Sequence, residues 1–294
     1  LLLSWYISSL PLQSEEWFHS AGSFKSERFT TLNQINKNNI QDLEIIWKYS
    51  SGQFNKKNTV QSSPIFTGKY LINVTIDGDV IAINPISGDL VWSKRLKKPV
   101  GRRGITFDNL SGPEIYVPTG DGIVSLNAQT GEIIKVYETG KSLLAPILGK
   151  DLLTVATLND GIKAFERISG KQKWHLSLEG SRKNKTKWYP RIWSGFSFDE
   201  ELNIYYAVTS NPGELIGVNR TNPDLSVSLI AVSGKTGKLL WHFQHIEHDL
   251  WDFDLVGPPI ITSLKSLNGG GKIVIALSKT GEIIVLDAVN GEPV

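Results

Sequence analysis

The chain is organised by a short repeated unit, in which a small residue is followed six positions later by Gly and usually four positions after that by Trp. The pattern occurs in residues 82–92 (AINPISGDLVW), 164–174 (AFERISGKQKW) and 231–241 (AVSGKTGKLLW). Residues 125–135 and 285–294 keep the Gly spacing but lack the Trp. Each copy is typical of a strand, a tight turn closed by Ser-, Thr- or Asn-Gly, and a second strand. Helical periodicity is scarcely visible, so we expect an all-β protein.

The spacing of the repeat glycines gives the size of each unit. Gly88, Gly131 and Gly170 are separated by 43 and 39 residues, which is the length of a four-stranded propeller blade. Gly237 and Gly291 follow after 67 and 54 residues, which indicates insertions, and in repeat folds these form loops on one face, often the binding face. The sequence therefore predicts a β-propeller of four-stranded blades, with about five blades present and C-terminal blades missing.

Four tryptophans occupy equivalent strand ends relative to these units. Trp92, Trp174 and Trp241 close three copies of the repeat, and Trp47 precedes the first copy. A large ring at such a position can dock one blade onto the next. We therefore expect all four to be structural.

The composition narrows the range of functions. The 294 residues include 31 basic and 29 acidic side chains, so no general attraction to nucleic acid is implied. Cys is absent, which excludes disulfides, thiolate metal sites and Cys nucleophiles. Residues 1–14 are interpreted as the remnant of a signal peptide or membrane segment, which would imply export, or alternatively as an edge strand. The partial propeller is expected over residues 15–294.

Three segments break the repeat and are the candidates for chemistry. Residues 94–104 (KRLKKPVGRRG) form a cationic stretch that is either a solvated turn or an anion-binding loop at the mouth of the propeller. Residues 180–229 are an insertion, and residues 241–254 (WHFQHIEHDLWDFD) are dense in His and acidic side chains. His245 and His248 are not expected to bind one metal together, because side chains three apart on an extended chain point to opposite faces.

Several of these segments resemble one known family. Residues 32–49 (LNQINKNNIQDLEIIWKY) are similar to its opening segment, and residues 103–107 (RGITF) to a motif of one of its branches. Residues 193–213 resemble the strand pair that carries a cofactor-stacking Trp, and residues 241–254 resemble the segment with the catalytic Asp. The chain thus resembles the quinoprotein dehydrogenases that use pyrroloquinoline quinone (PQQ), most closely their glucose and polyol branch. The resemblance implies an eight-bladed propeller.

The resemblance also implies a role for each matching residue. Asp252 matches the proton acceptor of the family, and Lys279 matches the Lys that contacts the quinone oxygens. Trp193 matches the ring under the cofactor, and Asn211 the Asn that binds Ca²⁺. Arg103 matches an Arg that meets the charge of the cofactor.

The residue types suit that chemistry. PQQ is a flat tricarboxylate, so cations and an aromatic platform would hold it. Ca²⁺ takes oxygen ligands and would polarise the quinone carbonyl as a Lewis acid. A carboxylate would take the proton of the substrate hydroxyl while hydride passes to the quinone.

Four positions depart from the family pattern. Gln61 stands where a Glu is usual near the cofactor and is expected to bind the cofactor in its place. Pro99 stands near where the glucose enzymes carry a His, and Leu143 where a hydroxyl residue is common. The loop that bears a metal-binding carboxylate is shortened to TLNDG, which leaves Asn159 or Asp160 as nearby substitutes. The absence of Cys rules out the adjacent-Cys pair of the methanol and ethanol branch, which favours the sugar or polyol branch.

We therefore expect PQQ-dependent oxidation of a sugar or polyol hydroxyl, with Ca²⁺ as metal and electrons passed to a membrane quinone or a cytochrome. The expected location is the periplasm, with attachment to the inner membrane through an N-terminal segment. The alternative is a non-catalytic propeller scaffold, similar to the envelope assembly lipoproteins that share the repeat but lack the HDLWDFD segment. No nucleic-acid partner is expected.

Overall fold

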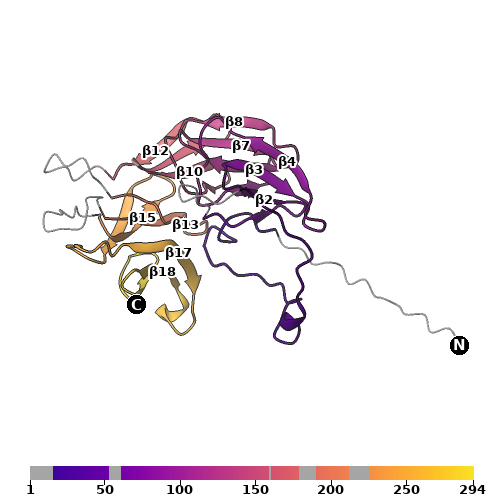
Figure 1. The fold of residues 1–294 in the computed structure, drawn as a ribbon. Helices are drawn as coiled ribbons and strands as arrows, with labels where there is room; N and C mark the ends of the chain where they lie inside the picture. Colours follow the sequence, from indigo (N-terminus) through magenta and orange to yellow (C-terminus); the bar gives the residue numbers. More distant parts are fainter. Residues whose placement is uncertain (1–15, 53–60, 159, 179–189, 212–224) are drawn as a thin grey trace.

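The computed structural model describes residues 16–52, 61–158, 160–178, 190–211 and 225–294. Within these ranges the chain forms five antiparallel sheets that follow one another along an arc, four with four strands and the last with three (Figure 1). We call them blades 1 to 5 in chain order. The prediction of an all-β propeller with about five blades is confirmed. The segment 1–14 lies outside the described residues.

The strands of each blade are neighbours in the order in which they occur along the chain. Blade 1 contains β1 (Ile65–Phe66), β2 (Leu71–Val74), β3 (Asp79–Ile83) and β4 (Leu90–Arg95). Blade 2 contains β5 (Thr106–Asp108), β6 (Glu114–Pro118), β7 (Ile123–Asn127) and β8 (Ile133–Tyr137). Blade 3 contains β9 (Ile147–Leu148), β10 (Leu152–Thr157), β11 (Gly161–Glu166) and β12 (Gln172–Leu176). Blade 4 contains β13 (Phe196–Asp199), β14 (Ile204–Val208), β15 (Ser228–Ser233) and β16 (Leu239–Gln244). Blade 5 contains β17 (Leu255–Ser263), β18 (Lys272–Ser278) and β19 (Ile283–Asp287).

Helical structure in the described ranges is limited to two short 3₁₀ turns, η1 (Ile40–Asp42) and η2 (Asn268–Gly270). No helix in that part of the chain is long and apolar enough to cross a membrane.

The apolar core lies between successive blades. The middle strands are apolar runs buried along their length, such as β14 (IYYAV), because a blade packs against each of their faces. The fourth strands are more exposed, as in β16. Buried clusters join blades 1 and 2, 2 and 3, 3 and 4, and 4 and 5. Stability is therefore spread over repeated interfaces between neighbours.

The repeat tryptophans dock one blade onto the next, as predicted. Trp92 in β4 donates its indole N–H to the carbonyl oxygen of Ala128 (3.1 Å). A Cβ on Gly131 would lie 2.7 Å from the Trp92 ring, and Gly131 has φ +73°, so both the close approach and the backbone require glycine. Equivalent bonds run from Trp174 to Gly234 (2.9 Å) and from Trp241 to Ala288 (3.3 Å).

Trp47 makes the same type of contact without belonging to a sheet. Its indole N–H donates to the carbonyl oxygen of Pro85 (3.0 Å), and its ring lies against Gly88 of blade 1. Residues 43–49 form no ladder within the described part of the chain, and Ile45 and Ile46 are exposed. Trp47 therefore contacts blade 1 in the same way as the Trp of a fourth strand contacts the following blade.

A segment near the N-terminus links the first strands of four blades. Trp17 exchanges backbone hydrogen bonds with Phe66 of β1 (2.9 and 3.0 Å). The carbonyl oxygens of Phe18, Phe24 and Lys25 accept from the first strands of blades 2, 4 and 5, at 2.7, 2.8 and 3.0 Å. Residues 17–25 thus run along the first strands of these blades, and His19 in this segment lines one cavity together with Arg28, which follows it.

Candidate functional site

Arg103 and Trp193 form one side of the candidate site. The Arg103 guanidinium carbon lies 4.5 Å from the centre of the Trp193 ring. The guanidinium also donates to the side-chain oxygen of Gln61 (2.7 Å) and to the backbone oxygen of Trp193. Burial lowers the pKa of Arg103 from its ordinary value, because the charged form loses solvation. The structure therefore brings together three residues predicted to contact the cofactor.

The backbone next to Arg103 explains how this side chain is held. The Arg103 N–H donates to the carbonyl oxygen of Leu143 (3.1 Å), which ties the loop after blade 1 to the loop before blade 3. Gly104 follows with φ +107°, and a Cβ there would lie 2.8 Å from the Ser20 hydroxyl oxygen. Glycine at this position lets the N-terminal segment approach the loop.

Lys279, Asp252 and Asp254 form a charged cluster near Trp193. The Lys279 ammonium lies 2.9 Å from an Asp252 oxygen, 3.0 Å from an Asp254 oxygen and 5.7 Å from the Trp193 ring centre. Desolvation lowers the pKa of Lys279, but hydrogen bonds to the two carboxylates outweigh it and raise this pKa overall. Desolvation raises the pKa of Asp254. The Asp254 side chain is 6% exposed and that of Asp252 is 48% exposed, so Asp252 is the carboxylate accessible to a substrate.

Asn211 connects this cluster to a second buried carboxylate, Asp249. The Asn211 backbone N–H donates to Asp254 (2.8 Å), and its side-chain NH₂ donates to Asp249. Asp249 also accepts from the backbone N–H groups of Trp251 and Phe253, both at 2.8 Å. Between them, Asp252 has a left-handed backbone with φ 67°, an uncommon conformation that Asp tolerates better than most residues.

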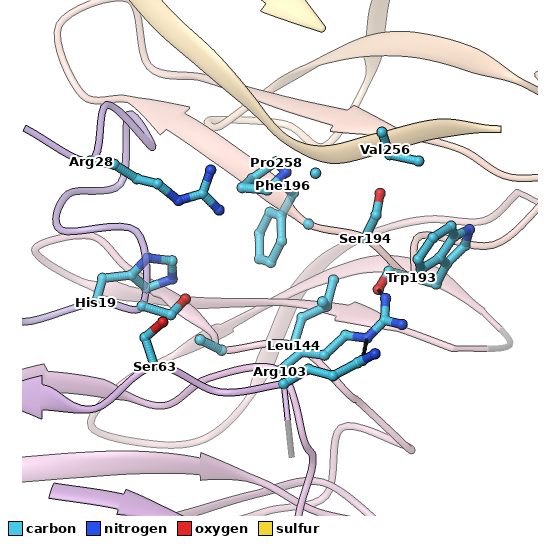
Figure 2. A pocket seen from close by; sticks show the side chains of 15 residues that line it. His19, Arg28, Ser63, Arg103, Leu144, Trp193, Ser194, Phe196, Val256 and Pro258 are labelled. Atoms are coloured by element: carbon cyan, nitrogen blue, oxygen red, sulfur yellow. Dashed lines mark hydrogen bonds between the residues drawn. The ribbon is translucent and has the colours of Figure 1, made fainter. Parts of the chain in front are cut away.

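A cavity of about 280 Å³ lies beside Trp193 and Arg103. Figure 2 shows Arg103 next to Trp193 and Arg28 reaching in beside His19 and Phe196. Its lining contains two arginines and no Asp or Glu among the described residues. Burial, with a smaller contribution from the Arg28 charge, lowers the pKa of His19 to about 4, so His19 is neutral near pH 7. The cavity is therefore suited to an anionic ligand.

The predicted site residues fall into two groups. Arg103, Gln61, Trp193, Lys279, Asp252 and Asn211 are joined by the contacts described above. Asp160 has other partners: it lies in the turn between β10 and β11 and pairs with Lys163 (2.6 Å) and His175 (3.0 Å). Asn159 lies outside the described residues, as does much of the insertion 180–229.

Two members of the site, Asp249 and Asp254, were not singled out from the sequence. The spacing of three acids within HDLWDFD is a signal that could have identified them, because acids are unusual at such density among aromatic residues. Their burial and their contacts with Asn211 depend on the tertiary fold.

The residues present fit the expected groups. One Trp face with two cations near it suits a flat tricarboxylate such as PQQ. The Asn211 side-chain oxygen is buried and has no hydrogen-bond partner within the described part of the chain, which leaves an acceptor that a hard cation could take. No group of three or more His, Cys, Asp or Glu side chains that could hold a metal occurs among the residues described. Asn211 is therefore the residue whose side-chain oxygen would hold a cation here.

Comparison with known proteins gives the family. The model of the PQQ family, described as the glucose/ethanol/alcohol dehydrogenase β-propeller domain, matches residues 17–144 and 147–294. Quinoprotein glucose dehydrogenase A of Acinetobacter calcoaceticus is 25% identical, over 91% of this chain and 42% of that protein. Quinate/shikimate dehydrogenase (quinone) of Acinetobacter baylyi is 24% identical, over 94% of this chain and 43% of that protein.

The solved structures agree on the fold. A europium-containing methanol dehydrogenase superposes with a TM-score of 0.79 at 21% identity, and covers 95% of this chain and 57% of its own. The chain spans less than half the length of the two Acinetobacter relatives named in the preceding paragraph. Because the family model matches nearly all of it, the chain belongs to the PQQ family of glucose, ethanol and alcohol dehydrogenase β-propeller domains.

Proposed function

We propose that the whole protein oxidises a hydroxyl group of a sugar or polyol, with PQQ as cofactor and Ca²⁺ beside it. The observation that carries the proposal is the convergence of Asp252, Lys279 and Asn211 on the side of Trp193, with Arg103 over the same ring. Bound PQQ would supply the hydride acceptor, and Ca²⁺ a Lewis acid beside it.

Each side chain has a distinct task in this proposal. The Trp193 ring provides a flat apolar platform, and Arg103 and Lys279 provide cations for carboxylate and carbonyl oxygens. Asp252 takes the proton of the substrate hydroxyl, which its partial exposure allows. The Asn211 oxygen would hold the cation. Asp254 and Asp249 make no contact with substrate and hold the cluster together from the buried side.

The substrate class rests on composition and on the relatives. The chain has no Cys and therefore no adjacent-Cys pair. Two of its relatives are named for glucose and for quinate or shikimate, which all carry several hydroxyl groups on a ring. The name of the second relative also includes a quinone, which supports a membrane quinone as electron acceptor; a cytochrome is the other candidate. The proposed setting is the periplasmic side of the inner membrane.

The test is reconstitution of the full-length protein with PQQ and Ca²⁺, followed by an oxidation assay with an artificial electron acceptor. Glucose, other sugars, cyclic polyols and ethanol are compared. We expect turnover with a sugar or polyol that depends on both additions, and little turnover with ethanol. Ethanol as the preferred substrate would overturn the substrate class. Failure of the complete, Ca²⁺-loaded protein to bind PQQ would favour a non-catalytic scaffold.

A further inference from the structure

Asp249 is a buried carboxylate for which the proposed chemistry has no direct use. It is 1% exposed and lies three residues before Asp252. Its two oxygens accept from Trp251 N–H, from Phe253 N–H and from the side-chain NH₂ of Asn211. One carboxylate therefore joins the loop around Asp252 to the end of the segment that follows β14.

The contact with Asp249 determines how the Asn211 amide is turned. An amide has one end that donates and one end that accepts, whereas a carboxylate only accepts. Only the NH₂ end of Asn211 can therefore face Asp249, and the oxygen must face away from it. The Asn211 backbone N–H is also fixed, by its bond to Asp254 (2.8 Å), so the side chain cannot relocate as a whole.

The oxygen that faces away is buried and without a partner in the described part of the chain. Buried polar atoms are nearly always paired, so an exception calls for an explanation such as an ion or a water. A water needs two to four polar partners, and the neighbouring acids are already engaged with Asn211, Lys279 and backbone N–H groups. An amide oxygen without a donor nearby is a ligand for a hard cation.

We propose that Asp249 is a positioning residue, which holds the Asn211 amide with its oxygen turned toward a hard divalent cation. This rests on the proposed function for the identity of the cation, Ca²⁺. Asp249 itself does not touch the cation. It acts through Asn211, as the partners behind metal ligands commonly do.

Exchanging the side chains at positions 249 and 211, one after the other, should first break and then restore this arrangement. In Asp249→Asn, the oxygen that keeps the bond to the Trp251 N–H leaves the NH₂ opposite Asn211; the Asn211 amide then turns over to accept from it, and its oxygen leaves the cation. Asn211→Asp in that background restores the arrangement, because one carboxylate oxygen accepts from the new amide and the other faces the cation. Both variants lose the same bond to the Phe253 N–H. Because the double variant also adds a carboxylate charge at position 211, Asn211→Asp alone is measured as the reference for that charge.

The measurement is a titration of the PQQ-free, full-length protein with Tb³⁺, read by luminescence sensitised by nearby tryptophans, with Ca²⁺ as competitor. Asn211→Ala identifies the signal that comes from this site. We expect Asp249→Asn to weaken binding about 10- to 100-fold, the usual effect of changing the residue behind a ligand. The double variant should recover at least half of that loss on a logarithmic scale.

Three results would overturn the proposal: an unchanged affinity in Asp249→Asn, a double variant as weak as the single one, or a signal that Asn211→Ala does not alter. Thermal unfolding of each variant without metal shows whether it is folded at the temperature of the titration. A separate titration with PQQ keeps the two claims apart. If PQQ does not bind but the Tb³⁺ pattern holds, the proposed function fails and the role of Asp249 stands.

Discussion

Trp92 and Trp193 are both tryptophans, but they have different surroundings in the structure. Trp92 belongs to the repeat, donates its N–H to Ala128 and packs on Gly131 of the next blade. Trp193 lies outside the repeat and has two cations, Arg103 and Lys279, within 6 Å of its ring centre. The Trp92 ring makes its contacts with the next blade, whereas the Trp193 ring has two charged side chains near it. We infer that the repeats supply stability and the segments that interrupt them supply chemistry.

The largest effect expected is on turnover, from Asp252→Asn. The change removes the proposed proton acceptor but keeps the size of the side chain, so PQQ should still bind. Turnover should fall about 10²- to 10⁴-fold, the range for loss of a general base. The measurement is the initial rate with saturating PQQ and Ca²⁺, with Asp89→Asn in an exposed turn as the control. Turnover near that of the control would show that Asp252 is not the base.

The next effect is on stability, from Trp92→Ala. Removal of this partly buried ring should lower the free energy of unfolding by about 2–4 kcal/mol, from lost burial and a cavity against blade 2. Urea unfolding measures it. The matched control is Trp251→Ala, because Trp251 is 65% exposed, and this change should cost about 0.5 kcal/mol or less. Equal losses for the two would contradict a structural role for the repeat Trp.

A third effect depends on pH and concerns His19, which contacts both the scaffold and the cavity. The pKa of His19 is lowered from 6.5 to about 4 in the folded chain. The unfolded chain therefore binds a proton first as the pH falls, and stability is lost between about pH 6.5 and pH 4. The loss should reach about 3 kcal/mol, from a 2.5-unit difference. Unfolding of His19→Gln across this range should lack that component; an unchanged pH dependence would exclude His19 as its source.

The smallest effect is expected at residues 125–135, a copy of the repeat that lacks a Trp. Lys135 occupies the equivalent position in β8, and its ammonium donates to the backbone oxygens of Arg167 (3.1 Å) and Ile168. Because these bonds are partly solvated, Lys135→Ala should lower the free energy of unfolding by about 1 kcal/mol or less. A loss as large as that of Trp92→Ala would mean that any side chain at this position, and not the Trp ring itself, stabilises the contact between blades.

The repeat made most of the fold predictable. The Gly spacing located the third strand of every blade and the fourth strand of blades 1 to 4, and a Trp ring approaches four of the five repeat glycines closely. The crossing of the first strands by residues 17–25 could not be predicted in this way. It uses backbone hydrogen bonds, which leave no mark on the choice of side chains.

The candidate site was predictable only in part. The resemblance of residues 241–254 to a known segment pointed to Asp252, and the structure places Lys279 beside it. Asp249 and Asp254 were missed, because their importance comes from Asn211, 38 and 43 residues earlier in the chain. Asp160 pairs with both Lys163 and His175, which the register of β11 and β12 sets opposite each other and which the spacing of residues did not reveal.

The comparison of the two tryptophans can be tested most directly by titrating PQQ into Trp193→Ala and Trp92→Ala. Both variants are used in full-length protein with Ca²⁺, at a temperature where each is folded, and quenching of the remaining tryptophan fluorescence reports binding. We predict that Trp193→Ala weakens PQQ binding at least about 10-fold through loss of the stacked ring. Trp92→Ala should bind PQQ within about 2-fold of the wild type, since its ring only docks blades. Wild-type affinity in Trp193→Ala, or an equal loss in both variants, would contradict the division between scaffold and site.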